Sequence, residues 1–312
     1  MRIAIFGSGG VGGYFGGRLA ELGEDVIFIA RGAHLEAMNR TGLRVDSIAG
    51  NFTLRQVSAT DNPKQAGKVD YVICSVNAWQ VQAAAKAMRP MIGPETLVIP
   101  LQNGVEAADQ LIEVLGADAV VGGLCAIITF QTGPGHIKHF GANPLIRFGH
   151  LDNHADPRIN ALSETFNRCN GVKSSIPDDI KVALWQKFML ISTWSGVGAV
   201  TRAPIGVLLQ QAETRQMLFD AMQEIYTLAL ARDIEMPEDS VQKTIDTLES
   251  FPANSTTSMQ RDLVDGLPSE LDAQNGAVVR LAEEVEVYTP VNRFILGSLR
   301  SLELRARGAL KF

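Results

Sequence analysis

The sequence predicts an α/β domain built on a parallel sheet, followed by an all-α domain. In the first half of the chain, apolar runs of strand length alternate with amphipathic stretches. This alternation is typical of parallel strands that are joined by crossover helices. After about residue 178 the pattern changes to long stretches with helical periodicity. We therefore expect an α/β domain over residues 1–178 and a helical domain over residues 179–312.

The elements of the first domain follow from local patterns. Helices are predicted at 11–22 and 79–91. Alternation predicts a small hairpin at 43–59, inserted in the sheet, and "TGPG" within 119–149 marks a turn between antiparallel strands. Apolar runs predict buried strands at 2–6, 26–30, 69–76 and 96–101.

The second domain shows helical periodicity with prolines close to several expected helix starts, among them Pro204, Pro237 and Pro268. The sequence "PDDI" around Asp179 also has the composition of a helix start. The predicted helices cover 179–200, 204–232, 236–250, 254–265, 269–286 and 290–306.

Composition excludes several classes of protein. The formal net charge of −6 offers no basic surface for nucleic acid or anionic membranes, and the longest apolar runs are too short to span a bilayer. Three cysteines without metal or redox spacing indicate buried thiols in a reducing compartment. Strand-like sequence begins two residues after Met1, which leaves no room for a signal peptide. We expect a cytoplasmic protein with neither nucleic-acid nor membrane partners.

A glycine-rich turn follows the first predicted strand. Gly7, Gly9 and Gly12 form G-x-G-x-x-G at the start of a helix, the pattern of a Rossmann-type dinucleotide-binding domain. In that pattern the first glycine makes the tight turn, the second admits the pyrophosphate, and the third lets helix and strand pack closely. The alternative is a purely structural turn. The predicted cofactor-binding residues here are Gly7, Ser8, Gly9, Gly10, Val11 and Gly12.

Arg31 indicates which dinucleotide is bound. It follows the second predicted strand, where NAD-binding domains place a carboxylate that accepts from the ribose 2′-OH. A guanidinium there suits a 2′-phosphate, because its planar fork pairs with phosphate oxygens. The alternative is a solvated surface arginine. The sequence therefore favours NADP(H) as the cofactor.

Four further segments, taken together with the glycine motif, resemble the ketopantoate reductase (2-dehydropantoate 2-reductase) family over nearly the whole chain. The resemblance implies an active site in the cleft between a Rossmann domain and a helical domain, and NADPH-dependent reduction of a 2-keto acid to a 2-hydroxy acid. The segments are "GSGGVG…R", "LQNGV" (101–105), "GPGHIKHFG" (133–141), "LWQKF" (184–188) and "SMQRDLVDGLPSELDAQNG" (258–276).

The resemblance assigns a catalytic role to Lys187. Hydride addition to a ketone leaves negative charge on oxygen, which a lysine ammonium could stabilise and protonate. The resemblance further implies substrate binding by Asn103, Ser195, Ser258 and Glu270, and cofactor contacts by Asn77 and Asn103.

Simpler interpretations of these residues stay open. Lys187 could be a solvated helix lysine, and Glu270 could be a first-turn acid after Ser269 that interacts with the helix dipole. Ser258 could be an N-cap, and the "QNG" at Asn103 is also an ordinary turn sequence.

Two departures from the family pattern place the substrate in question. The family usually carries asparagines four and eight residues after its lysine, where this chain has Ile191 and Ser195. Asn77 stands where the family commonly has a lysine near the cofactor. Alternatives are a related reductase acting on another carbonyl or an imine, and an NADP-binding regulator without turnover. A homodimer is left open.

The histidines do not predict a metal site. His136, His139, His150 and His154 have mixed spacing and no accompanying cysteine pair, so exposed or core histidines are expected.

Overall fold

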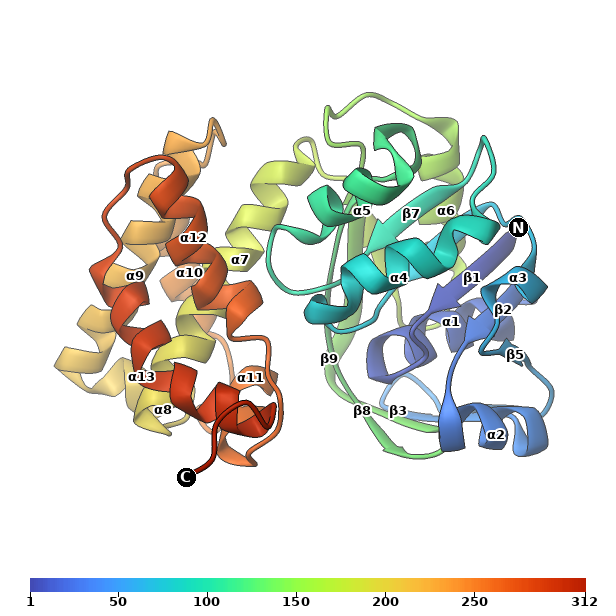
Figure 1. Ribbon diagram of the computed structural model, residues 1–312, viewed down its shortest axis with the longest axis horizontal. Coiled ribbons are helices and arrows are strands. Elements are labelled where there is room, and N and C mark those ends of the chain that lie inside the picture. The colour runs from blue at the N-terminus through green and yellow to red at the C-terminus, as the bar shows by residue number, and fades with distance from the viewer. The chain divides into compact units, whose positions relative to one another are not determined.

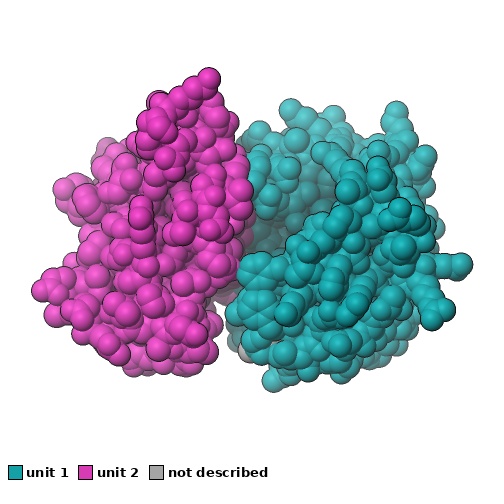
Figure 2. Space-filling view, turned by 90° about the horizontal axis from the view of Figure 1, so that it is seen from below, with its two compact units in different colours: residues 1–102, 107–180 teal, residues 103–106, 181–312 magenta. Residues whose placement is uncertain are grey.

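The computed structural model describes residues 1–312, apart from the side chain of Ala142. The chain forms two compact units, which Figure 2 shows in teal and magenta. Unit 1 comprises residues 1–102 and 107–180, and unit 2 comprises residues 103–106 and 181–312. The short segment 103–106 therefore belongs with the helical part of the chain, although the sequence places it inside the α/β part.

Unit 1 is built on a five-stranded parallel sheet, in the order β5-β2-β1-β6-β7. Four of its strands are those that the apolar runs predict, and the fifth, β5, lies at the edge beside β2. The predicted α/β class with a parallel sheet is confirmed. The strands are β1 (Arg2–Phe6), β2 (Asp25–Ile29), β5 (Ser58–Thr60), β6 (Tyr71–Cys74) and β7 (Leu97–Pro100).

A second sheet has the order β10-β9-β3-β4, with β8 also paired to β9. Strands β8 (Gly122–Gly133) and β9 (His136–Gly149) form the antiparallel pair predicted around "TGPG". The hairpin predicted at 43–59 exists as β3 (Leu43–Ser47) and β4 (Phe52–Leu54), but its insertion in the parallel sheet is wrong. It joins the second sheet because β3 pairs with β9. The remaining strand is β10 (Lys173–Ser175).

Helices cover both faces of the parallel sheet (Figure 1). Helix α1 (Gly10–Glu21) contacts β1 and β2 on one side and the β8–β9 pair on the other, so it lies between the two sheets. The opposite face of the parallel sheet packs in a separate core against α4 (Val81–Met88) and α5 (Ala107–Leu115). The other helices of unit 1 are α2 (Gly32–Thr41), α3 (Pro63–Ala66) and α6 (Pro157–Arg168).

Unit 2 is helical, as predicted, with a single apolar core. The predicted helix 204–232 is interrupted, because Gln211 adopts an extended conformation and the Thr214 hydroxyl donates to the Leu208 carbonyl. No glycine or proline marks this break. Its helices are α7 (Ile180–Thr201), α8 (Ile205–Gln210), α9 (Ala212–Ala231), α10 (Ser240–Glu249), α11 (Ser258–Val264), α12 (Ala277–Glu284) and α13 (Pro290–Ala306).

The helix predicted at 269–286 also differs from the structure. It begins as a π-helical turn, η4 (Asp272–Gly276), and continues as α12. Residues 269 and 270 thus lie ahead of the helix, in an irregular segment.

The cysteines are buried, as predicted: Cys74, Cys125 and Cys169. Burial raises the pKa of the Cys74 thiol to about 11 and that of Cys169 to about 12. Among the described residues, no helix combines the length and the apolar content that a bilayer-crossing segment requires.

Candidate functional site

The glycine-rich turn has the geometry that its pattern predicts. Gly7 has φ = +97°, a conformation that L side chains rarely adopt. A Cβ at Gly12 would lie 2.1 Å from the Gly7 carbonyl oxygen and 2.2 Å from Ser75 Oγ, so only glycine fits there. A Cβ at Gly9 would have no atom within 4 Å. The space beside Gly9 is therefore open to a ligand, at the N-terminus of α1 where backbone N–H groups favour phosphate.

A pocket of about 270 Å³ opens beside this turn, within unit 1. Its wall includes four of the predicted cofactor residues, Gly7, Ser8, Gly9 and Arg31. The other five are not part of it: Gly10, Val11, Gly12, Asn77 and Asn103. Its wall is formed by Phe6, Gly7, Ser8, Gly9, Ile29, Ala30, Arg31, His34, Val76, Gln80, Ala83, Ala84 and Gln131.

Three polar pocket residues were not anticipated from the sequence. His34 lies three residues after Arg31, so helical spacing could have placed it on the same wall. Gln80 follows the predicted strand that ends near Cys74. Gln131 comes from β8, a hundred residues further along the chain than Arg31, and no local pattern indicates it.

Arg31 is available for an anionic ligand. It is exposed, directly after β2, in an extended conformation at the N-cap of α2. Within the part of the chain that the structure describes, its guanidinium makes no ion pair. The exposed Asn77 lies outside the wall, and its backbone N–H donates to Gln80 Oε1 at 3.3 Å. The arrangement fits a dinucleotide whose phosphates lie at the glycine turn and whose adenosine end lies beside Arg31.

A second cluster of polar residues lies within unit 2. Asn103 Nδ2 donates to Glu270 Oε2 at 2.8 Å, although the two residues are 167 positions apart. Both side chains are half-buried. The structure thus joins two of the residues that the family resemblance assigns to the substrate.

The loop that carries Asn103 is held in place by two contacts. Gly104 has φ = +97°, and a Cβ there would lie 2.6 Å from the Ala273 carbonyl oxygen. Glu106 forms a two-point ion pair with Arg280 of α12, at 2.7 and 3.1 Å. Both contacts reach the η4–α12 segment, which follows Glu270 directly.

Ser269, the residue before Glu270, is held by a buried carboxylate. Glu303 of α13 accepts from the backbone N–H of Ser269 at 3.0 Å and from its hydroxyl at 2.6 Å. Arg307 donates to Glu303 at 2.6 Å and to the Ser269 carbonyl at 3.0 Å. Because Ser269 is fixed on both sides, the next residue has a defined direction.

Lys187 lies on α7 and is half-buried; in the sequence it stands between Trp185 and Phe188, whose buried rings contact each other edge to face. No hydrogen bond or ion pair of its ammonium occurs among the described residues. Because α7 is continuous, Lys187, Ile191 and Ser195 share one helix face, as their spacing predicts. Ser195 is fully buried, and its Oγ has no hydrogen-bond partner among the described residues.

Ser258 is the exposed first residue of α11. It is not the N-cap that the sequence left open as an alternative. Thr257 has that role, because its side chain accepts from the Gln260 N–H. Ser258 is therefore free of a capping function.

Asp262 is an unanticipated titratable group of the same segment. Burial raises its pKa to about 6, the Arg261 charge opposes this shift, and the Glu270 charge adds to it. A carboxyl group with such a pKa changes its charge close to neutral pH.

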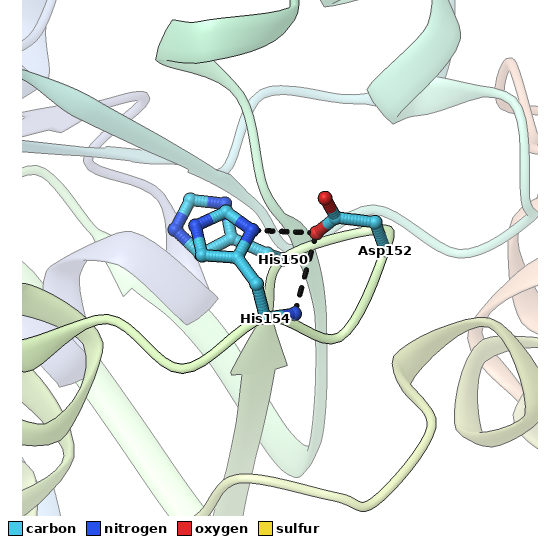
Figure 3. A group of neighbouring side chains, drawn as sticks. All are labelled: His150, Asp152 and His154. Carbon is cyan, nitrogen blue, oxygen red and sulfur yellow. Dashed lines mark hydrogen bonds and ion pairs between the residues drawn. The ribbon is translucent and has the colours of Figure 1, made fainter.

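The histidines of unit 1 have structural partners. His136 Nε2 pairs with Asp46 at 2.8 Å, and His139 Nδ1 pairs with the Ser47 hydroxyl at 2.8 Å. Figure 3 shows His150, Asp152 and His154, whose ligand atoms lie within 4.8 Å of one another.

This His-Asp-His group is satisfied by hydrogen bonds. His154 Nδ1 pairs with Asp152 at 2.6 Å, and His150 Nε2 pairs with the buried Asp156 at 2.8 Å. The two rings are stacked at 3.8 Å with 22° between their planes. The geometry is that of a hydrogen-bonded turn.

The fold and the glycine turn define a nicotinamide-dependent oxidoreductase. The model of the ketopantoate reductase PanE/ApbA family matches residues 3–153, and the model of its C-terminal domain matches residues 179–303. The chain belongs to this family, whose members are oxidoreductases that act on a CH–OH group. The resemblance inferred from the motifs is confirmed.

Relatives cover almost the whole chain. An uncharacterized oxidoreductase, YkpB, of Bacillus subtilis is 29% identical over 97% of this chain and 99% of its own length. A 2-dehydropantoate 2-reductase of Nostoc is 28% identical, over 98% of this chain and 96% of its own.

Solved structures of other proteins share this fold over nearly the whole chain. A PanE/ApbA family ketopantoate reductase from Ralstonia eutropha JMP134 superposes with a TM-score of 0.89 and 32% identity, covering 98% of this chain and 100% of its own. D-mandelate dehydrogenase in a ternary structure with NADH and anilino(oxo)acetate shares the fold at 22% identity, with a TM-score of 0.87 and coverage of 98% and 100%.

Proposed function

We propose that this protein reduces 2-dehydropantoate (ketopantoate) or a similar 2-keto acid to the 2-hydroxy acid with NADPH, as in pantothenate biosynthesis. The observation that carries the proposal is the Asn103–Glu270 contact. It unites two residues that lie far apart in the sequence and that the family resemblance assigns to one site. Residues 1–178 would serve as the cofactor-binding domain and 179–312 as the substrate-binding domain of a cytoplasmic enzyme.

The chemistry assigns a role to each side chain. The nicotinamide, when bound, supplies the hydride. The Lys187 ammonium stabilises the oxygen that gains charge and gives it a proton, a contribution typically worth about 10²–10⁴ in rate. Glu270 accepts a hydrogen bond from a substrate hydroxyl, and Asn103 Nδ2 keeps that carboxylate oriented. Ser258, exposed and not used as a cap, adds a polar contact to the substrate, whereas Ser195, which the resemblance also assigns to the substrate, is fully buried.

NADPH is the proposed cofactor because the Arg31 guanidinium is unpaired at the pocket wall among the described residues. A dianionic 2′-phosphate would give it a partner, whereas the NADH ribose would not. Asn77 supplies no charge, so cofactor discrimination would depend on Arg31 alone. Because Asn103 Nδ2 donates to Glu270, we assign Asn103 to the substrate before the cofactor.

A second candidate substrate class rests on the face of α7. Ile191 and Ser195 follow Lys187 on that face, where the family usually has two asparagines. A site with fewer amide groups favours a less polar substrate, since a missing hydrogen-bond partner penalises a polar ligand. The alternative is thus reduction of another 2-keto acid, or another carbonyl or imine, with an apolar side chain.

One assay separates these proposals. A panel of 2-keto acids, including ketopantoate and aromatic analogues, is tested by NADPH and NADH absorbance with the wild type, Lys187→Ala and Arg31→Ala. We expect NADPH turnover, a loss of about 10²-fold or more in kcat for Lys187→Ala with NADPH binding retained, and weakened NADPH but unchanged NADH binding for Arg31→Ala.

The remaining outcomes decide among the alternatives. Preference for an aromatic keto acid over ketopantoate would support the second substrate class. Tight NADP(H) binding without turnover across the panel would indicate a nucleotide-binding regulator and overturn the enzymatic proposal. Gel filtration with light scattering decides between monomer and homodimer.

A further inference from the structure

His34 occupies a distinctive place in the pocket wall. It lies in the first turns of α2, and both of its ring nitrogens contact backbone groups of other segments. Nε2 lies 2.8 Å from the Ser8 carbonyl oxygen, inside the glycine turn. Nδ1 accepts from the backbone N–H of Gly135 at 3.0 Å, in the turn between β8 and β9. The imidazole therefore bridges two loops that are far apart in sequence.

These two contacts determine the protonation state of the ring. A backbone N–H can only donate, so Nδ1 must carry a lone pair. A carbonyl oxygen can only accept, so Nε2 must carry the proton. The ring is thus neutral, with its single proton on Nε2. Burial lowers the pKa of His34, which agrees with this state.

The contact with Ser8 controls the direction of a second group. The Ser8 carbonyl and the Gly9 N–H belong to one planar trans peptide, in which they point in opposite directions. Holding the carbonyl on His34 therefore directs the Gly9 N–H the other way. The Ser8 hydroxyl donates to the Ile29 carbonyl at 3.1 Å, so the residue is fixed at two points. Gly9 is the N-cap of α1, where a pyrophosphate is expected.

We infer that His34 is a positioning residue of the dinucleotide site, which acts as a neutral imidazole that fixes the Ser8–Gly9 peptide and the β8–β9 turn. This inference rests on the proposed dinucleotide binding. Both ring nitrogens of His34 already make hydrogen bonds, so His34 does not bind the 2′-phosphate. Arg31 is the group that binds this phosphate. Protonation of Nδ1 would set two N–H groups against each other and release Gly135.

The other charged groups near His34, Glu36 on the same helix among them, are present in both the wild type and His34→Gln, so a comparison of the two proteins cancels their titration. Arg31, on the same helix, lines the same pocket. Across the β8–β9 turn, His136 is directed to Asp46, which also pairs with Arg44. Strand β5, which packs against α2, consists of Ser58, Ala59 and Thr60. The glycine turn offers only backbone groups and the Ser8 hydroxyl to the ring.

His34→Gln is the decisive variant, because a glutamine amide offers one donor and one acceptor without titrating near neutral pH. His34→Leu removes both contacts, and His154→Gln, outside the pocket, is the matched control. Dissociation constants for NADPH are measured by fluorescence at about pH 7.5 and about pH 5, and 15N NMR of the ligand-free protein reports the His34 ring.

At about pH 7.5 we expect His34→Leu to bind NADPH about tenfold more weakly and His34→Gln to stay within about threefold of the wild type. On lowering the pH, the affinity of the wild type should fall more than that of His34→Gln, because only the wild type can protonate the ring. Because both proteins bind the same NADPH, the comparison cancels the effect of 2′-phosphate protonation on the affinity. The NMR spectrum should show Nε2 protonated and Nδ1 unprotonated at the higher pH.

Two results would overturn the inference. One is identical pH dependence in the wild type and His34→Gln, and the other is a ring protonated on Nδ1 at about pH 7.5. If His34→Leu does not fold, His34→Gln and the NMR measurement still decide. A protein that binds no nucleotide while its His34 ring has the expected tautomer would instead contradict the proposed function.

Discussion

The dinucleotide pocket and the Asn103–Glu270 cluster are assembled in opposite ways. The pocket is built mostly from the first part of the chain: the end of β1, the glycine turn, the end of β2 and the start of α2. The segment after β6, helix α4 and strand β8 complete its wall. The cluster joins a four-residue loop to a segment 167 residues later and depends on long-range contacts to α12 and α13. A site of the first kind can be found by motif, whereas a site of the second kind needs the folded chain or a known relative.

The two sites also differ in the interactions that fix their geometry. Glycines at Gly7 and Gly12 define the turn through backbone conformation and close packing. The cluster in unit 2 depends mainly on charged side chains, which pair with one another or bind backbone groups of Ser269, with Gly104 as a close backbone approach. We therefore expect substitutions to affect the first site through steric overlap and the second through electrostatics.

Gly12→Ala should have the largest effect. The new Cβ would overlap the Gly7 carbonyl oxygen and Ser75 Oγ, and overpacking of this kind costs about 1–3 kcal/mol or more. We expect a lower thermal midpoint for unit 1 and loss of dinucleotide binding. Gly9→Ala is the matched control, since its Cβ has open space: its stability should match the wild type while its NADPH affinity falls. Equal stability of both variants would contradict the steric explanation.

Asn103→Asp should have the next largest effect. It would place a second carboxylate where the amide now donates to Glu270 at 2.8 Å, so the two like charges repel. We expect kcat/KM for the keto acid to fall about tenfold or more, with NADPH affinity unchanged. The loss should shrink at lower pH, where the pair can share a proton. Asn103→Ala, which lacks the repulsion, should lose less and show no such pH dependence.

Asp262→Asn should stabilise the protein in a pH-dependent way. The folded-state pKa of about 6 is above the unfolded value of about 3.9, so folding favours the protonated acid. The ionised carboxylate then costs stability above about pH 6, and this cost disappears below about pH 4. Allowing for partial exposure, we expect a gain of about 1 kcal/mol near pH 8 and none near pH 4, measured by urea denaturation. A gain that is independent of pH would rule out the titration.

Arg280→Gln should have the smallest effect. It removes a largely exposed ion pair with Glu106, and such pairs contribute about 0–1 kcal/mol. We expect a small loss of stability and a modest rise in KM, because Gly104 and Ala273 still hold the loop of Asn103. A large loss of kcat would show that the ion pair, and not the backbone contact, positions Asn103.

Much of unit 1 could be predicted from its sequence, because most strands of its parallel sheet are continuous apolar runs. Gly7 and Gly12 are also recognisable, because the backbone conformation at the first and the close packing at the second require glycine. The hairpin at 43–59 was assigned to the wrong sheet, since pairing of β3 with β9 involves residues about ninety positions away. The break at Gln211 lacks any glycine or proline, and the tertiary packing of α8 and α9 overrides helical periodicity there.

The candidate site likewise has residues that local sequence patterns predict and residues that only the folded chain or the family resemblance identifies. Arg31 and the glycine turn follow from local spacing, whereas the two backbone contacts of His34 depend on Ser8 and Gly135 coming together in the fold. Lys187, Glu270 and Asn103 could be named only through the resemblance. Asp262 has no sequence signal, because its altered pKa arises from burial in the folded unit.

Helix α1 is enclosed between two sheets, and this arrangement affects how a nucleotide would be received. A helix held on both sides has little freedom to adjust, so its first turn should already have its bound shape in the empty protein. The amides in the middle of α1 should accordingly exchange with solvent slowly even without ligand, at rates set by global unfolding.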